Sequence, residues 1–186
     1  MNPEAGSALH MSIDTKSFSE FLRDFEQTVH YSASSLLRLS DNESMEHRRS
    51  DSWTRKQILG HLIDSAANNH QRFVRAQFTN DLVFPGYDGD QWVDVQHYND
   101  ADWSGLVDLW KLYNLHLARL AKYIPENVLE LERSKHNLDQ IAFQTVDSNK
   151  PVTLEYFIRD YVDHMKHHLD QIFEGLGSEA TGTSTP

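Results

Sequence analysis

The sequence predicts an all-α protein that folds as a four-helix bundle. Four long stretches carry apolar residues at three- and four-residue steps, which is the spacing of one helix face. No stretch shows a convincing strand pattern, and there are no internal repeats. Amphipathic helices of similar length bury their apolar faces by closing into a bundle. The 186 residues suit one domain with a sizeable core.

The first helix is expected to begin between Asp14 and Ser17 and to end near residues 40–42. Ser17 and Glu20 have the spacing of a capping box, in which each residue bonds to the other's backbone N–H. The second helix is expected to open at Thr54, again with a capping-box residue three positions later, and to end near Phe78.

The third helix is expected to start near Asn99, with Tyr98 and Trp103 at the spacing of a hydrophobic staple. Its apolar stripe includes Leu109, and Pro125 ends it.

The fourth helix follows Pro151, with Thr153 as its cap, and ends at Gly175 because glycine favours helix termination. It contains His164 and His168 at the edge of its apolar face.

Two long connections separate the last three helices, at residues 79–100 and 126–151. Connections of this length in a compact domain are often functional. Residues 138–146 are interpreted as short extended structure. The ends are small and polar, so we expect flexible tails at 1–12 and 178–186 around a domain at 13–177.

Composition excludes several function classes. The chain has no cysteine, which excludes disulfides, thiolate metal ligands and a cysteine nucleophile. Its net charge of −11 disfavours nucleic acid as a partner. No apolar run is long enough for a membrane span and no secretory signal opens the chain, so we expect a cytoplasmic protein without a membrane partner.

Three histidines are the candidate metal ligands. His164 and His168 are four residues apart and therefore share one helix face. His61 lies in the middle of the second helix, and helices of a bundle can bring facing side chains together around a metal. Three imidazoles leave open positions on a divalent ion, which is typical of a catalytic site.

Other polar residues have roles that the sequence leaves open. Asp64, one turn after His61, could orient a ligand or act as a catalytic base. Asp160 could support His164, or be a solvated carboxylate. His116 could be a fourth ligand or a buried structural histidine. Gln171 and Asn68 could line the site. His167 is expected to be exposed.

These motifs resemble the DinB/YfiT-like superfamily. The resemblance rests on Trp53 with the run GHLID at 60–64, on YDGDQW at 87–92, and on HMKHHLDQI at 164–172. It implies a four-helix bundle with up-down-down-up topology and a divalent ion, nickel or zinc with iron or manganese as alternatives, on His61, His164 and His168. It also implies a homodimer. Met165 and Asp170 depart from the usual pattern, which has Glu and Gly there.

The resemblance implies enzymes of two kinds: thiol transferases and metal-dependent hydrolases. A tris-histidine ion can activate a bound thiol or a bound water. The first hypothesis is therefore transfer of a low-molecular-weight thiol, as co-substrate, to an electrophilic small molecule. The alternatives are a hydrolase and a non-catalytic metal-binding or stress-response module.

Overall fold

The computed structural model describes residues 16–47 and 52–176. The tails predicted at 1–12 and 178–186 lie outside these ranges. The described residues form four long helices: α1 (Phe18–Leu36), α3 (Arg55–Arg75), α5 (Trp103–Lys122) and α8 (Leu154–Phe173). Shorter helices lie between them: α2 (Asp41–Ser44), α4 (Gly89–Gln96), η1 (Tyr98–Asp100), α6 (Glu126–Leu129) and α7 (Leu138–Ile141).

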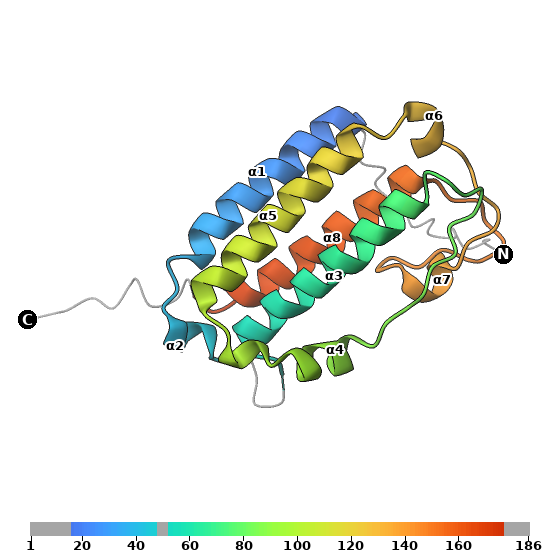
Figure 1. Cartoon of the computed structure of the whole chain (residues 1–186). Helices are drawn as coiled ribbons and strands as arrows, with labels where there is room; N and C mark the ends of the chain where they lie inside the picture. Colours follow the sequence, from blue (N-terminus) through green and yellow to red (C-terminus); the bar gives the residue numbers. More distant parts are fainter. Residues whose placement is uncertain (1–15, 48–51, 177–186) are drawn as a thin grey trace, which may run out of the picture.

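The four long helices form the predicted bundle with the predicted topology. Helices α5 and α8 each pack against both α1 and α3. Figure 1 shows that α3 and α5 run in one direction, whereas α1 and α8 run in the other. This order is up-down-down-up. Among the helices of the described ranges, none combines the length and apolarity that crossing a bilayer requires.

Three of the four long helices begin at the capping residue that the sequence predicts. The capping boxes at Ser17 and Thr54 are formed, and the Thr153 side chain accepts a hydrogen bond from the backbone of Tyr156. The predicted start near Asn99 was wrong. Asp102 caps α5 by accepting from the backbone N–H of Gly105, at 2.7 Å, because its carboxylate is well placed to satisfy a free N–H of the first turn.

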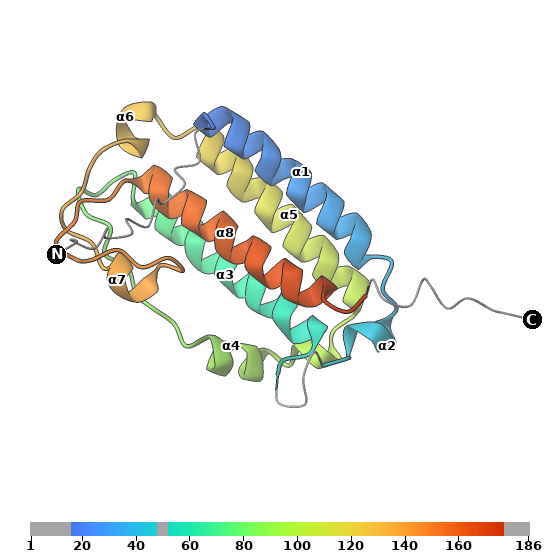
Figure 2. The same cartoon turned by 180° about the vertical axis from the view of Figure 1, so that it is seen from behind.

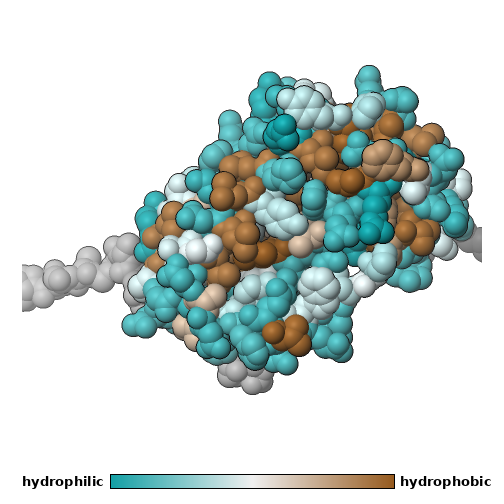
Figure 3. Space-filling model, in the orientation of Figure 1, coloured by the Kyte–Doolittle hydropathy of each residue, from teal (hydrophilic) through white to brown (hydrophobic). Residues whose placement is uncertain are grey.

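The core consists of apolar side chains from all four long helices, as their stripes predict. Leu109 is an exception, because half of its side chain is exposed on α5. The neighbouring Leu112 is also exposed. Figure 3 shows hydrophobic residues gathered in a broken band, between hydrophilic ones, on the side of the molecule that Figure 1 presents. Helix periodicity identified the buried side of α5, but it predicted an apolar face wider than the one that is buried.

The parallel arrangement of α3 and α5 explains the length of the connection between them. A helix of 21 residues is about 30 Å long, so the chain must return that distance before α5 begins. Part of residues 79–100 forms α4 on this return path (Figure 1). Asp88 caps α4 by accepting from the backbone of Gln91.

The connection from α5 to α8 covers one end of the bundle, where α6 and α7 lie (Figure 2). The prediction of extended structure at 138–146 was wrong, because Leu138–Ile141 is a helical turn. Leu138 is fully buried, and the backbone carbonyl of Asn137 accepts two hydrogen bonds, from the N–H groups of Gln140 and Ile141, that start this turn. The burial of Leu138 and these local hydrogen bonds therefore outweigh the strand preference of the β-branched residues in the segment.

Candidate metal centre

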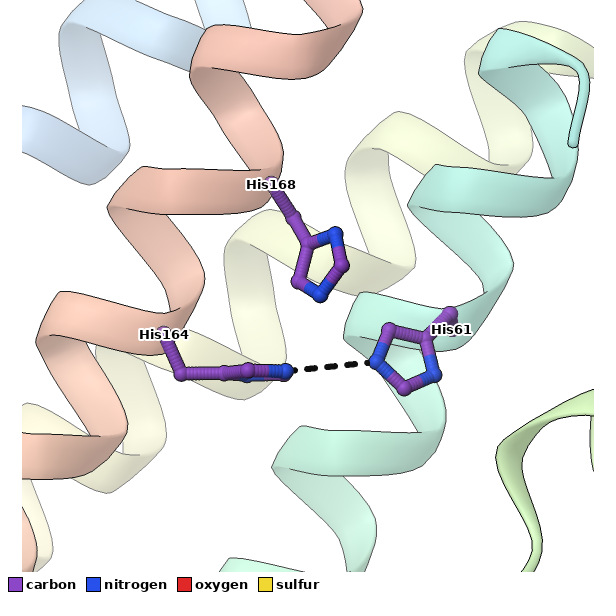
Figure 4. Close-up of side chains that lie close together, drawn as sticks. All are labelled: His61, His164 and His168. Carbon is purple, nitrogen blue, oxygen red and sulfur yellow. Dashed lines mark hydrogen bonds between the residues drawn. The ribbon is translucent and has the colours of Figure 1, made fainter. Parts of the chain in front are cut away.

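The structure brings His61, His164 and His168 together between two helices. His61 projects from α3, and the other two project from α8 toward it (Figure 4). Their candidate ligand atoms all lie within 4.8 Å of one another. The Nε2 atoms of His61 and His164 are 3.3 Å apart. The i, i+4 spacing on α8 and the antiparallel contact with α3 produce this geometry.

Neighbouring polar groups leave the Nε2 atoms of the two α8 histidines facing the centre. Gln171 Oε1 lies 2.9 Å from Nδ1 of His168, and it accepts the Nδ1–H. Ser65 Oγ lies 3.4 Å from Nδ1 of His164. A metal-bound histidine usually has its other ring nitrogen held in this way. The two contacts therefore favour Nε2 as the ligand atom on both rings.

Burial keeps the three rings neutral. It lowers the pKa of His61 to about 4, with a smaller contribution from the nearby His168. Burial, followed by the neighbouring histidines, lowers the pKa of His164 to about 3. Burial also lowers the pKa of His168, partly offset by the Gln171 hydrogen bond. Neutral imidazole is the form that binds a metal, so the donors are ready at neutral pH.

Aromatic rings and one glycine enclose the centre. The Trp53 ring packs 5.0 Å from His61, and the Phe143 ring lies 5.5 Å from His164, centroid to centroid. Tyr87 lies 6.4 Å from His61. A Cβ on Gly89 would come within 3.3 Å of the His61 ring. The first turn of α4 therefore approaches His61 closely, and a larger residue there would press on the ring.

Asp64 is buried beside the centre, but it does not bond to His61. Its Oδ1 accepts from Gln96 Nε2 at 2.6 Å and from the Tyr98 hydroxyl at 2.7 Å. Burial raises its pKa, and these two hydrogen bonds oppose that effect. Within the described ranges, its Oδ2 and the Nδ1 of His61 are both buried without a hydrogen-bond partner.

The hydrogen bond from the Tyr98 hydroxyl to Asp64 also holds the connection between α3 and α5 against α3. The Tyr98 ring occupies the space beside Gly60, where an added Cβ would lie only 2.1 Å from a ring atom. Gly60 thus lets Tyr98 reach the carboxylate one turn along the helix. Sequence reasoning missed Gln96 and Tyr98, because nothing local to Asp64 points to partners more than 30 positions away.

The remaining candidates are not part of the histidine cluster. Asp160 accepts hydrogen bonds from the backbone N–H groups of Phe143 and Gln144, at 2.9 and 2.6 Å, and so holds the loop that carries Phe143. His116 packs against His70 at 5.1 Å and is not among the clustered ligands of the described residues. Asn68 bonds to the backbone of Asp64. His167 is exposed, as predicted.

The donor set fits a divalent transition metal. Two ligands each about 2.05 Å from a tetrahedral ion are roughly 3.3 Å apart, and the His61 and His164 Nε2 atoms already have this separation. Imidazole suits zinc, nickel, iron and copper. The buried, unpartnered Nδ1 of His61 and the two supported rings of α8 are consistent with a site built around the Nε2 atoms.

Comparison with known proteins places the chain in a family. A family model described as "DinB superfamily" matches residues 24–172. The chain belongs to the DinB superfamily. The match spans all three clustered histidines and every long helix in whole or in large part, so the motif-based prediction of this family is confirmed.

Two curated proteins are similar to this chain over most of their length. The chain is 25% identical over 136 residues to "Putative metal-dependent hydrolase YfiT" of Bacillus subtilis, covering 73% of this chain and 71% of that protein. It is 26% identical over 154 residues to "Putative metal-dependent hydrolase OB0782" of Oceanobacillus iheyensis, covering 83% of each.

A solved structure has the same fold as this DinB-superfamily chain. It is described as "YfiT from Bacillus subtilis is a probable metal-dependent hydrolase with an unusual four-helix bundle topology". The TM-score is 0.67 with 21% identity, over 87% of this chain and 89% of that one. This likeness supports the bundle and its helix order.

The neutral histidines predict that the metal-free protein loses stability in mild acid. The pKa values of His61 and His164 lie below the usual 6.5, so the unfolded chain binds more protons from about pH 6.5 down to about 4. The free energy of unfolding therefore falls as pH falls through this window. Replacing His164 with Asn should flatten the profile by on the order of 2 kcal/mol, at about 1.4 kcal/mol per pKa unit.

The measurement is urea unfolding in the presence of a chelator at a series of pH values. The raised pKa values of Asp64 and Asp160 act in the opposite direction near pH 4, but they are common to both proteins. The exposed His30 on α1, replaced with Asn, is the matched control. Superimposable profiles for wild type and His164→Asn would contradict the prediction.

Proposed function

We propose that this chain is a metal-dependent enzyme whose divalent ion is held by His61, His164 and His168. The observation that carries the proposal is the convergence of three neutral imidazoles from two helices, with one Nε2 pair at the spacing of tetrahedral ligands. Nickel and zinc are the first candidates, and iron and manganese are alternatives. The descriptions of the two curated relatives as metal-dependent proteins support the same conclusion.

The proposed reaction is transfer of a low-molecular-weight thiol to an electrophilic small molecule. A divalent ion in such a site lowers the pKa of a bound thiol or water, so that either can be a nucleophile at neutral pH. In the transfer, a bond forms between the thiol sulfur and an electrophilic carbon, the leaving group departs with its bonding electron pair, and the thiol proton passes to solvent. The chain itself has no cysteine that such electrophiles would modify.

Hydrolysis of a small-molecule substrate is the second candidate. The specific observation in its favour is the description of both curated relatives as metal-dependent hydrolases. The same three histidines would serve it, with water in place of the thiol. A purely structural metal is less consistent with the donor set, because structural zinc usually has four protein ligands and the described residues bring three together.

The side chains around the histidines have distinct tasks in either reaction. Gln171 and Ser65 orient the two rings of α8, so that their Nε2 atoms face His61. Trp53, Tyr87 and Phe143 cover the rings and limit the access of bulk water. Excluding water from a site strengthens every electrostatic interaction inside it.

Asp64 is proposed as a positioning residue. Its Oδ1 is already used by Gln96 and Tyr98, and its Oδ2 is buried, so it is poorly placed to take a proton from a substrate. A metal-bound histidine usually donates its other ring N–H to a carboxylate, a backbone carbonyl or water. The unpartnered Oδ2 and the unpartnered Nδ1 of His61 are the atoms that would be linked.

The Asp64→Asn variant should bind metal about 10- to 100-fold more weakly, because it loses the charge that supports His61. Asn keeps an oxygen that can accept from Gln96 and Tyr98, so the melting temperature of the metal-free protein should change little. Competition with a metal-binding dye measures the affinity. The exposed Asp170, replaced with Asn, is the control. Equal affinity in Asp64→Asn and wild type would remove the positioning role.

The two candidate reactions are separated by one set of assays on metal-loaded protein. Conjugation of glutathione or free cysteine to chlorodinitrobenzene tests thiol transfer, and release of nitrophenol from nitrophenyl esters and amides tests hydrolysis. Thiol transfer predicts conjugation above the uncatalysed rate that disappears in His168→Ala and persists in His116→Ala. Metal-loaded protein that conjugates no thiol but hydrolyses an ester with the same dependence on His168 would reverse the order of the candidates.

A further inference from the structure

A cavity of about 240 Å³ adjoins the histidine cluster. His164 and Ser65 line it, and so do Arg72, Asp160 and the rings of Phe143 and Phe157. It lies between α3, α8 and the loop around residue 142, so the crossover from α5 to α8 forms part of its wall. Pockets for drug-sized ligands are usually about 300–1,000 Å³. This cavity therefore suits a compact molecule.

Arg72 is a buried cation that faces this cavity. Its side chain belongs to α3 and the residue is 6% exposed. One guanidinium nitrogen donates to the carbonyl of Pro85 at 2.9 Å, and the other terminal nitrogen lies 3.4 Å from Asn69 Oδ1. The guanidinium carbon is 6.0 Å from the centre of the Phe157 ring. Five N–H groups are available, so these neutral partners leave donors unused.

The guanidinium has no carboxylate partner within residues 16–47 and 52–176. A buried charge without a counterion is costly, and burial accordingly lowers the pKa of Arg72. Two other buried cations of the described ranges do have such partners, since Lys56 pairs with Asp41 and Arg55 pairs with Glu46. A third, Arg133, lines no part of this cavity and donates instead to three backbone carbonyls. The fold therefore maintains an unneutralised cation at the wall of a cavity next to the candidate metal centre.

The charges around the cavity select the kind of anion. Asp160 is the acidic residue in its lining, and its two oxygens are directed to the backbone N–H groups of Phe143 and Gln144. Its negative charge opposes ligands with several charges, such as phosphates. The planar guanidinium matches a planar carboxylate with two parallel hydrogen bonds. The phenyl rings and Ile141 provide an apolar surface for the rest of the molecule.

We propose that this cavity binds a small organic monocarboxylate, with the carboxylate on Arg72 and the apolar part against Phe143 and Phe157. If the proposed function holds, the bound molecule is the substrate of the metal centre, because His164 lines the same cavity. This one consequence rests on the proposed function. Arg72 would then be a binding residue that sets substrate class. Binding of the carboxylate itself does not require the metal.

Binding is tested by calorimetric titration of chelator-treated protein with three probes: acetate, isobutyrate and benzoate. Each is paired with its uncharged amide. We expect at least one carboxylate to bind, its amide to bind more weakly, and Arg72→Gln to weaken the carboxylate by about 10- to 100-fold, the loss of hydrogen bonds to a charged group. Gln can still donate to the Pro85 carbonyl, so the fold should persist. Arg72→Lys, which keeps the charge without the fork, should be intermediate.

Two controls make the outcome specific. Arg75→Gln removes an exposed arginine from the next turn of α3 and should leave binding unchanged. Ala142→Phe adds bulk to the cavity lining and should weaken binding with Arg72 intact. Absence of binding by all three carboxylates, equal binding of acid and amide, or unchanged binding in either Arg72→Gln or Ala142→Phe would overturn the proposal.

Failure of the proposed function gives a different result. His168→Ala should bind the carboxylate as wild type does, because His168 does not line the cavity. If the wild type binds no metal but binds the carboxylate through Arg72, the metal-dependent function fails and the anion site stands. If carboxylates bind only after metal loading and not to His168→Ala, they are ligands of the ion, and the assignment to Arg72 is wrong.

Discussion

The antiparallel contact between α3 and α8 is the interaction on which the site depends. It places His61 opposite the His164–His168 pair, and buried apolar residues on both helices fix the register. Leu62 on α3 and Met165 on α8 are almost fully buried beside the two ligand positions. A shift of either helix by one residue would rotate a histidine by about 100° away from the centre. Core packing therefore sets the metal-site geometry.

The parallel arrangement of α3 and α5 is the second constraint. It requires a connection that runs the length of the bundle, and that connection brings α4, Tyr87 and Tyr98 to the face of α3 that carries His61 and Asp64. The connection from α5 to α8 supplies Phe143 and part of the cavity wall in the same way. The two long connections that this topology requires therefore form walls of one site. A bundle with short loops would lack these walls.

Much of this could be predicted from local patterns. Helix periodicity, capping boxes at Ser17 and Thr54, and the i, i+4 spacing of His164 and His168 are properties of short windows, and the structure has them. Contacts between distant segments could not be predicted in this way. Asp64 with Tyr98, Asp160 with the loop at 143–144, and the unpaired Arg72 depend on tertiary packing. The helical turn at 138–141 is likewise set by the burial of Leu138.

The central claim is that His61, His164 and His168 hold one divalent ion, and metal content per chain tests it most directly. Untagged wild type and the His61→Ala, His168→Ala and His116→Ala variants would be compared by elemental analysis. The account predicts about one divalent ion per chain in wild type and in His116→Ala, and close to none in the other two. Wild type that holds no metal after incubation with nickel or zinc, or a His61→Ala variant with the full complement, would contradict it.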